Sequence, residues 1–364
     1  MNICLIGSGI PSLILANILA KKNIKISIID ERKIKNNFSN RTVGITKDNT
    51  DYLEKEKILI KNKAWEINRI KIFDELLGEH QLLNFGNTND VLFYIAKNFN
   101  LLNLLKKITK KNKLIKIIKN KNLSFYNSII KNKNNYDLVV NFNQKNTISK
   151  KIFFKRVNKD YNSFAFTCLI KHKKCNNNTA NQIFTKNGPI AFLPCSKTET
   201  SIVYSILKNN ESFSDEKIFD LIKKYNKKYF IKSFSKLEKY ELKGSILKNY
   251  FYKNILCFGE NIHKIHPLAG QGLNMTIRDI KILSGLIDHK IDHGLPLDQS
   301  ILKEFQEKTK HLNYLFVSSI NFINEFFKLN NKFKNSYSKK IFNFLDNNAL
   351  FKKYSVMIAD KGFN

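Results

Sequence analysis

The sequence predicts an α/β protein that combines a Rossmann-like parallel sheet with a second, β-sheet domain and with C-terminal helices. A short apolar run at residues 3–6, a glycine-containing turn and a helical apolar pattern at 12–22 form the start of a βαβ unit. Residues 151–206 show short apolar runs separated by turn residues, which is typical of antiparallel strands. From Leu273 onward the pattern is mainly helical.

The N-terminal turn has nearly the glycine spacing of a nucleotide-binding loop. Gly7 permits a tight turn, and Gly9 lets the backbone approach a pyrophosphate, while Ser12 stands at the third glycine position. A second strand at 24–29 ends at Asp30, where an acidic side chain accepts hydrogen bonds from ribose hydroxyls. An ordinary βα turn is the alternative, and Asp30 favours the nucleotide.

Further elements follow along the chain. We expect strands at residues 70–73, 91–95, 138–140 and 255–258 and a helix at 101–108. The lysine-rich run at 106–121 fits a solvated helix face. Residues 312–327 carry a broad apolar face that predicts core packing, with lipid contact as the alternative.

The charge balance is strongly basic, with 63 basic and 30 acidic residues and a net charge of +33. Nucleic-acid sites favour arginine, because its planar guanidinium binds phosphate and guanine bidentately. The chain has only these arginines: Arg32, Arg41, Arg69, Arg156 and Arg278. We therefore expect no nucleic-acid partner. Abundant Lys, Asn and Ile are typical of A/T-rich coding sequence, and attraction to an anionic membrane is the functional alternative.

Cysteine usage and the N-terminus indicate a cytoplasmic protein. The five cysteines are scattered and lack a CxxC spacing, which argues against disulfides and a zinc site. The apolar segment at 3–20 lacks a basic region before it, and Gly7, Gly9 and Pro11 interrupt it. It therefore fits neither a signal peptide nor a membrane-spanning helix.

Two histidine pairs have spacings that occur in metal sites. His263 and His266 have Glu260 as their only nearby carboxylate partner, and no thiolate. His289 and His293 lie four residues apart, at the expected polar end of a helix. We expect no metal at either pair.

The segment 257–274 is the most informative stretch of the chain. It follows an expected buried strand and ends where a helix begins near Leu273 and Asn274. Gly270 and Gly272 allow the backbone to lie against a flat ligand. The positive end of the following helix dipole would face the electron-rich edge of a reduced flavin.

This segment resembles the "GDAAH-x-x-HP-x-x-GQG-x-N" signature of the class A flavin hydroxylases, and most closely their ubiquinone-biosynthesis branch (the UbiH/UbiF type). Supporting resemblances run along nearly the whole chain. Residues 41–45 are similar to the arginine-containing segment near the flavin, and 93–98 to the "GY-x-x-x-N" segment. Residues 180–194 are similar to the "F-T-x-x-G-P-x-A-x-L-P" segment.

The resemblance implies a PHBH-type architecture in which two domains are interleaved. The FAD-binding domain would comprise residues 1–69, 96–150 and 246–297, the substrate-binding sheet 70–95 and 151–245, and a C-terminal helical region 298–364.

The resemblance also implies site residues. Pro267, Gly270, Gln271 and Gly272, in the loop that includes Leu268 and Ala269, would line the flavin and substrate face. The residues implied to bind FAD are Gly7, Gly9, Ser12, Asp30, Arg41, Gly259, Glu260, Gly270, Gly272, Leu273 and Asn274.

The implied reaction is hydroxylation of a prenylated phenol through a flavin C4a-hydroperoxide formed with O₂. NAD(P)H or a separate reductase would supply the electrons. A quinone-biosynthesis complex and peripheral contact with the inner face of the cell membrane are further implied partners.

Two departures from the family pattern leave alternatives open. Glu260 replaces the aspartate of "GDAAH", and Asn143 and Gln144 replace the Asp and Gly of the "ADG-x-x-S-x-x-R" motif, which is tied to FAD and nicotinamide use. One alternative is a degenerate paralogue that is a non-catalytic component of a quinone-biosynthesis complex. Another is a different flavin oxidoreductase, such as a prenyl reductase.

Overall fold

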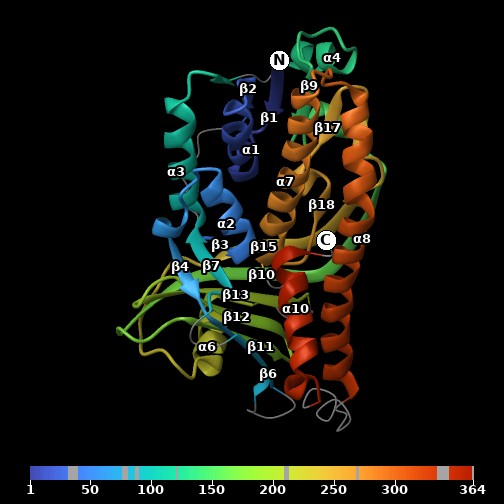
Figure 1. Ribbon diagram of the computed structural model, residues 1–364. Coiled ribbons are helices and arrows are strands. Elements are labelled where there is room, and N and C mark those ends of the chain that lie inside the picture. Colours follow the sequence, from blue (N-terminus) through green and yellow to red (C-terminus); the bar gives the residue numbers. More distant parts are fainter. Residues whose placement is uncertain are drawn as a thin grey trace.

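A computed structural model describes residues 1–31, 40–75, 81–86, 90–119, 122–208, 213–267, 270–333 and 344–362, with the backbone alone for 324 and 327–333. The expected loop residues Leu268 and Ala269 lie outside the described residues. Figure 1 shows two stacked parts, a parallel sheet with its helices above and a larger sheet below.

The upper part is built on a six-stranded sheet with the order β16-β17-β9-β1-β2-β8. All pairings are parallel except β16 with β17. The strands are β1 (Asn2–Ile6), β2 (Lys25–Asp30), β8 (Ile115–Lys119), β9 (Leu138–Asn141), β16 (Phe251–Tyr252) and β17 (Ile255–Cys257). The strand order reverses between β1 and β9, and ligands of such sheets bind beyond the carboxyl ends of the strands at this point.

Helices cover both faces of this sheet because its strands are apolar on both sides. Ile3, Leu5 and Val139 are fully buried in one continuous core. The helices are α1 (Ile10–Ala20), α3 (Asn98–Lys111), α4 (Leu123–Ile130), α5 (Thr147–Lys151) and α7 (Gln271–Asp292). The helices and strands expected around the first βαβ unit and before and after the C-terminal signature are confirmed.

Strand β8 corrects the expectation of a solvated helix face at 106–121. Helix α3 ends at Lys111, and the chain then pairs in parallel with β2 as an edge strand. Ile115 points into the core, whereas Lys116 and Lys119 are exposed. Lysines are common on edge strands because they discourage further strand pairing. The lysine-rich sequence therefore fits an edge strand as well as the exposed helix face that we expected.

A small antiparallel sheet lies between the two parts. It has the order β3-β7-β4, with β3 (Thr42–Thr46), β4 (Ala64–Ile67) and β7 (Phe93–Lys97). Helix α2 (Lys47–Lys55) follows β3, and a short 3₁₀ helix, η1 (Lys61–Lys63), precedes β4. The strand expected at 91–95 is thus present, but it pairs with β3 and β4 rather than with the sheet to which the resemblance assigned residues 70–95.

The lower part is a nine-stranded sheet with the order β18-β15-β10-β13-β12-β11-β5-β6, to which β14 adds by pairing with β10. Its strands are β5 (Arg69–Asp74), β6 (Gln81–Phe85), β10 (Arg156–His172), β11 (Thr179–Thr185), β12 (Gly188–Pro194), β13 (Glu199–Leu207), β14 (Ile231–Phe234), β15 (Glu238–Leu247) and β18 (His263–Lys264). The pairing of β11 with β5 is parallel and the others are antiparallel.

The two faces of this sheet differ. Phe192, Ile202 and Tyr204 are buried in a cluster with residues of α6 (Asp215–Tyr225), so α6 covers their face. Because side chains alternate along a strand, Ser201 and Val203 point to the other face. That face meets the three-stranded sheet, since the hydroxyl oxygens of Ser201 and of Thr42 in β3 lie 2.9 Å apart in a hydrogen bond.

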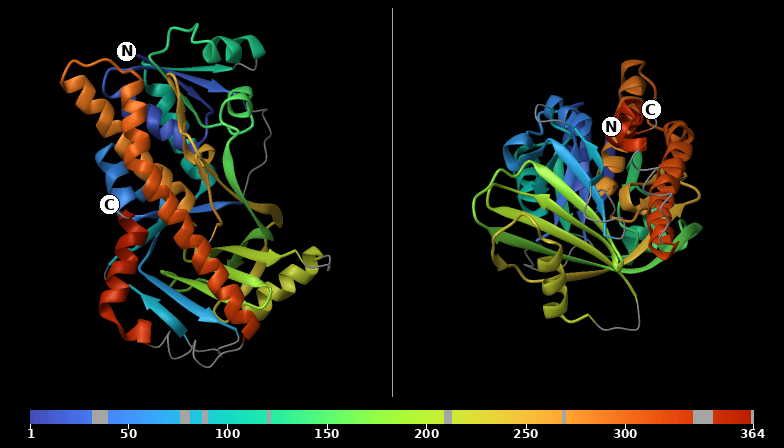
Figure 2. Two further views of the ribbon diagram at one scale, coloured as in Figure 1. Left: turned by 90° about the vertical axis from the view of Figure 1, so that its right-hand side faces the viewer. Right: turned by 90° about the horizontal axis from the view of Figure 1, so that it is seen from below.

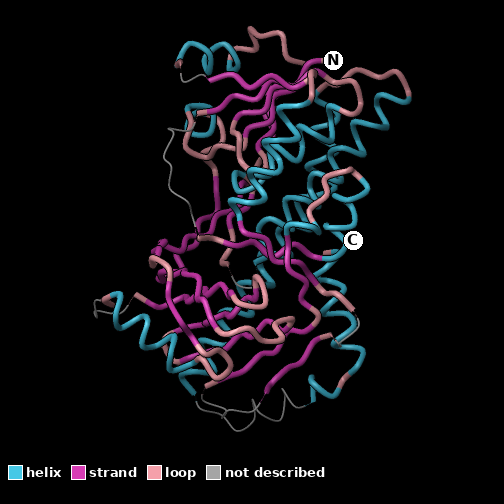
Figure 3. The backbone as a smooth tube through the Cα atoms, turned by 90° about the vertical axis from the view of Figure 1, so that its left-hand side faces the viewer, coloured by secondary structure: helices cyan, strands magenta, loops and turns pink. Residues whose placement is uncertain are grey.

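Two C-terminal helices run along the side of both parts (Figures 1 and 2). Helix α8 (Gln299–Phe333) is 35 residues long, and α10 (Ala349–Lys361) lies beside its lower half. Figure 3 shows the same arrangement from the left-hand side of Figure 1, with strands in an upper and a lower layer. Within the described part of the chain, no helix has both the length and the apolar composition that crossing a membrane requires.

Candidate flavin site

The first βα turn requires glycine at position 7. Gly7 has a φ of +110°, which strains any residue with a side chain, and an added Cβ would lie 3.3 Å from the Phe142 Cβ. The Gly7 N–H donates to the Ile29 carbonyl at 2.9 Å, which fixes the turn against β2. Gly9 follows as the N-cap of α1, with extended backbone and no side-chain cap. The first amides of α1 are therefore available to an anion.

Ser12 and Asp30 lie where the sequence pattern places them. Ser12 is fully buried, and its hydroxyl has no hydrogen-bond partner in the described structure. A small residue is required there because α1 packs directly on the sheet. The Ser8 hydroxyl donates to Asp30 Oδ1 at 2.5 Å, so the carboxylate is held at the carboxyl end of β2.

Glu31 is a site residue that the sequence pattern did not reveal. Its carboxylate accepts hydrogen bonds from the Tyr126 hydroxyl and from the side-chain amide of Asn143. Burial and this contact raise the pKa of Tyr126. Glu31 thus ties the carboxyl end of β2 to the loop after β9, on both sides of the point where the strand order reverses.

The altered "ADG" motif forms a complete hydrogen-bond network. The Asn146 side chain caps α5 by accepting from the Ser149 N–H at 3.0 Å. The Ser149 hydroxyl donates to the Asn143 carbonyl at 2.7 Å, and the Gln144 amide donates to Ser245 Oγ at 3.3 Å. The loop is therefore ordered by its own amides, without the Asp and Gly of the family pattern.

The C-terminal signature packs against the first turn through one aromatic side chain. Gly259 has a φ of +62°, and a Cβ there would lie 3.6 Å from Phe142 and 3.4 Å from Thr276 of α7. Phe142 also contacts the Cβ position of Gly7, so both glycine turns share one side chain. Glu260 is exposed beside them.

The helix start after the signature is open toward a ligand. Gly270 is the N-cap of α7, with φ +62° and no side-chain cap, and its N–H donates to the Pro267 carbonyl at 3.1 Å. A Cβ at Gly270 would have the Gly44 N at 3.8 Å as its only described neighbour within 4 Å, and a Cβ at Gly272 would be 3.8 Å from Ile265. Both glycines therefore leave space beside the backbone.

Two polar side chains of this helix start differ in their use. Gln271 is buried, and its Oε1 has no hydrogen-bond partner among the described residues. Asn274 is fully used within the protein: it accepts from the Thr46 N–H at 3.0 Å and the Asn49 amide at 3.1 Å, and donates to the Gly44 carbonyl at 2.9 Å. Asn274 therefore positions the loop against β3, while Leu273 is half-buried beside it.

Helices α1 and α7 begin on the same side of the sheet. At their far ends Lys22, just after α1, pairs with Asp288 of α7. At the other end, the Gly7 turn before α1 meets the Gly259 turn at Phe142, and Gly259 lies beside Thr276 in the second turn of α7. Two positive helix ends thus face one region at the carboxyl edge of the parallel strands, which suits phosphates and an electron-rich ring. The residues present therefore fit FAD.

Arg41 lies at the junction with the nine-stranded sheet. Its guanidinium carbon is 4.8 Å above the Tyr240 ring of β15, a cation–π contact. The side chain is exposed at this point, next to β3, whose Gly44 approaches the Gly270 loop. The role of Arg41 beside the flavin therefore stays a prediction from the sequence.

The histidines of the signature are structural in this arrangement. His263 Nε2 lies 2.8 Å from Asp279 Oδ2, and both are buried. His266 packs edge-on against Tyr161 with ring centroids 4.8 Å apart. No cluster of three or more metal-binding side chains occurs in the ranges that the structure describes.

Arg278 secures the C-terminal helices to α7. Burial lowers its pKa to about 10, and its guanidinium stacks 4.5 Å from the Phe316 ring of α8. A Cβ at Gly362, just after α10, would lie only 2.6 Å from Arg278 Nη1. The close approach explains a glycine at this helix end.

A family model described as "FAD binding domain" matches residues 142–293. The mitochondrial ubiquinone biosynthesis monooxygenase COQ6 of Dictyostelium discoideum is 22% identical over 433 residues, covering 91% of this chain and 85% of that protein. The ubiquinone hydroxylase UbiM of Neisseria meningitidis is 26% identical over 159 residues, which cover 42% of this chain and 34% of that protein.

Solved structures show the same fold. The p-nitrophenol 4-monooxygenase PnpA from Pseudomonas putida superposes with a TM-score of 0.79 at 12% identity, covering 100% of this chain and 98% of that one. PqsL from Pseudomonas aeruginosa gives 0.71 at 14% identity, over 90% and 96%. The chain is therefore similar to FAD-dependent aromatic hydroxylases, among them a monooxygenase and a hydroxylase named for ubiquinone, and it is an FAD-dependent monooxygenase.

Proposed function

We propose that this monooxygenase hydroxylates the aromatic ring of a polyprenyl phenol, a precursor of ubiquinone. One observation carries the proposal: apolar side chains gather where the flavin loop meets the nine-stranded sheet. Ile265 and Met275 flank the loop in sequence and pack in one cluster with Phe184 of β11 and Phe316 of α8. An aromatic ring with an apolar tail gains free energy by leaving water for such surroundings.

The protein's own residues would bind, orient and exclude water. Bound FAD, once reduced, supplies the oxygen-activating chemistry. The open starts of α1 and α7 would hold its phosphates and ring, and Gly270 and Gly272 keep the loop clear on that side. The apolar cluster around Met275 would keep water away from the reacting ring.

The names of two relatives support this substrate class, since both refer to ubiquinone. The electron donor is proposed to be NAD(P)H or a separate reductase. Asn143, which donates to Glu31, stands where the motif tied to nicotinamide use has an aspartate. The test of function should therefore not depend on which electron donor the protein uses.

Photoreduction of the purified holoenzyme followed by ¹⁸O₂ provides such a test. With a prenylated phenol, the account predicts one ¹⁸O atom in the product by mass spectrometry and less product from the same phenol without its tail. Reduction of the substrate without ¹⁸O would identify a prenyl reductase. A well-folded protein that binds no FAD would instead support the non-catalytic paralogue.

We further propose peripheral contact with an anionic membrane through the C-terminal helices, which would deliver the prenylated substrate. Large apolar side chains point to solvent there, with Phe322 71% and Leu350 65% exposed. On α10, Leu350, Tyr354 and Met357 recur at helical spacing on an exposed strip beside the packed Phe351. The net charge of +33 favours an anionic surface.

Co-sedimentation with vesicles tests this contact. We expect binding to phosphatidylglycerol vesicles and a loss when Leu350, Tyr354 and Met357 are all changed to serine. A matched control is Phe230→Ser, which removes an equally exposed ring from the far sheet. Vesicle binding that survives the triple change would contradict the membrane contact. Loss of partner proteins, but not of vesicle binding, in the triple variant would instead favour docking of these helices to a quinone-biosynthesis complex.

A further inference from the structure

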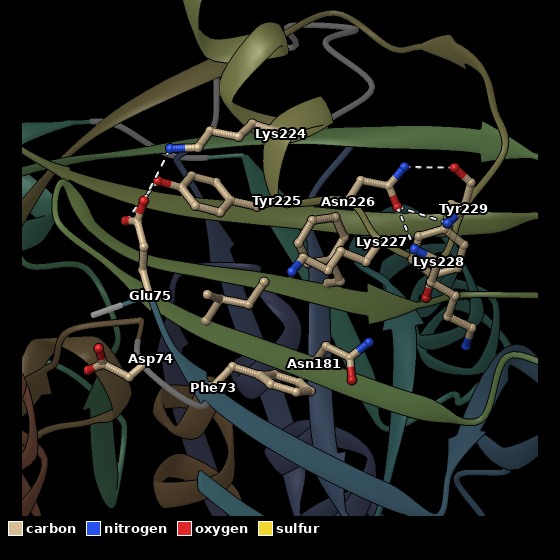
Figure 4. Close-up of a pocket in the computed structure, with 12 residues that line it drawn as sticks. Phe73, Asp74, Glu75, Asn181, Lys224, Tyr225, Asn226, Lys227, Lys228 and Tyr229 are labelled. Carbon is tan, nitrogen blue, oxygen red and sulfur yellow. Dashed lines mark hydrogen bonds and ion pairs between the residues drawn. The ribbon is translucent and has the colours of Figure 1, made fainter. Parts of the chain in front are cut away.

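A cavity among the described residues lies away from the Gly270 loop. It has a volume of about 260 Å³ and lies on the α6 side of the nine-stranded sheet. Strands β5, β11 and β12 form its floor, and the end of α6 with the following residues forms its wall (Figure 4). This is the face opposite to the one that carries Ser201 and contacts the flavin domain.

The floor and walls are aromatic. Phe73 of β5 pairs in register with Ile183 of β11, and Phe192 of β12 lies beside them. The ring centroids of Tyr229 and Phe192 are 6.2 Å apart in a stacked arrangement, and Tyr225 closes the other side. Aromatic walls favour an aromatic ligand, because offset and edge-on ring contacts add to apolar burial.

In the half of the cavity around Glu75, the polar side chains form hydrogen bonds with one another. Glu75 accepts from the Tyr225 hydroxyl at 2.9 Å, from Lys224 Nζ at 3.1 Å and from the Lys186 N–H at 3.0 Å. Figure 4 shows Glu75, Lys224 and Tyr225 together on one side. This half has no remaining demand for a charged ligand group.

The other half has polar groups that are not satisfied. The Asn181 Oδ1 is buried without a hydrogen-bond partner in the described structure. Lys228 is half-buried, its Nζ donates to the Asn177 Oδ1 at 3.2 Å and lies 5.2 Å from the centroid of the Tyr229 ring, and no ion pair with a carboxylate of the described residues is found for it. Burial lowers the pKa of Lys228, which Cys175 partly offsets and to which Lys71 adds, so a carboxylate placed beside it would stabilise its charge. Figure 4 places Asn181 and Lys228 on the same side.

We propose that this cavity binds a small aromatic monocarboxylate that carries a ring hydroxyl or amino group. Its ring would lie between Phe73, Phe192 and Tyr229, its carboxylate would pair with Lys228, and its hydroxyl or amino hydrogen would reach Asn181 Oδ1. The volume is just below that of typical drug sites, which suits a ligand on the order of a dozen non-hydrogen atoms. The cavity would be a binding site separate from the hydroxylation site.

The probe is 6-hydroxy-2-naphthoate, whose binding to the full-length holoenzyme is followed by its fluorescence. The neutral 6-hydroxy-2-naphthamide tests for charge, and 2-naphthoate tests for the hydroxyl. We expect the hydroxy acid to bind at least about tenfold more tightly than the amide, because a charge-assisted hydrogen bond is lost.

Variants assign the binding to this cavity. Lys228→Met should abolish the preference for the acid over the amide, and Asn181→Leu should abolish the preference for the hydroxyl. Ile183→Trp should fill the cavity and eliminate both. The control Lys223→Met removes an exposed lysine that pairs with Asp220 outside the cavity, and should change nothing.

The flavin side could also bind these aromatic probes, so each titration is repeated in excess FAD, which should leave binding to this cavity intact. Equal affinity of the wild-type protein for acid and amide would overturn the proposal. So would unchanged binding to a folded Ile183→Trp variant. If that variant fails to fold, unchanged selectivity of both Lys228→Met and Asn181→Leu overturns it.

Discussion

The side-chain amide of Asn143 donates a hydrogen bond to the Glu31 carboxylate. This contact joins the strand ends β2 and β9 at the point where ligands of such sheets bind. The family motif has an aspartate at position 143, which would place two carboxylates together. Asn143 at the aspartate position therefore complements Glu31, and this substitution does not by itself indicate a degenerate, non-catalytic protein.

Replacement of Asn143 by Asp tests this explanation. Asp keeps the acceptor that binds the Lys145 N–H at 2.8 Å, but it loses the donor to Glu31. We expect the free energy of unfolding at pH 8 to fall by about 1–3 kcal/mol, from repulsion and the lost hydrogen bond. Urea unfolding measures the change.

The pH dependence distinguishes repulsion from general damage. Two adjacent carboxylates raise the pKa of the pair in the folded state above the unfolded value of about 4. The deficit is therefore complete above the folded pKa and shrinks as the pH falls through it. Adding Glu31→Gln should restore stability at pH 8, and an equal deficit in both backgrounds would refute the explanation.

Asn274→Ala should be strongly destabilising. The side chain is buried and makes hydrogen bonds to Thr46, Asn49 and Gly44, so its removal leaves several unpaired groups. We expect a loss of about 2–4 kcal/mol in urea unfolding. Asn112→Ala, which removes one hydrogen bond in a half-exposed turn, should cost at most about 1 kcal/mol. Similar losses for both variants would show that the hydrogen bonds of Asn274 contribute little to stability.

Glu75 should make stability depend on acid pH. Burial opposes its ionisation, but hydrogen bonds from the Lys186 N–H, Tyr225 and Lys224 outweigh this and lower its pKa. Its contribution is therefore present above the unfolded pKa of about 4.3 and is lost as the pH falls through the lower folded value.

Glu75→Gln removes this contribution. Between pH 6 and pH 3, unfolding experiments should show a smaller stability loss for the variant than for the wild type, and at pH 7 the variant should be about 1–2 kcal/mol less stable. Glu216→Gln, an exposed acid on α6, is the control. Parallel pH profiles for wild type and Glu75→Gln would contradict the assignment.

Local patterns were sufficient to predict strands β1 and β17 of the parallel sheet and the start of α7. The apolar run before Gly7 and the one before Gly259 each form a buried strand, and both turns need glycine because of positive φ angles. These features depend on neighbours in sequence, so the sequence alone contains them.

Features that depend on distant pairing could not be predicted in this way. The edge strand β8 lies within a lysine-rich segment and forms by pairing with β2, and β7 (Phe93–Lys97) pairs with β3 and β4. The role of Glu31 depends on Asn143, which is 112 residues away, and that of Asn274 on Thr46, 228 residues away. The aromatic cavity likewise arises only when three strands and α6 come together.

The central claim is that FAD lies against the Gly270 loop, and Gly270→Ala tests it most directly when compared with Gly294→Ala. The two glycines have φ angles of +62° and +65°, so both substitutions should cost a similar ~1 kcal/mol in backbone strain. A Cβ at Gly294 has no described neighbour within 4 Å and is at the far end of α7. Titration of the apoproteins with FAD should give wild-type affinity for Gly294→Ala and at least about tenfold weaker binding for Gly270→Ala. Equal FAD affinity of the two variants would contradict the account.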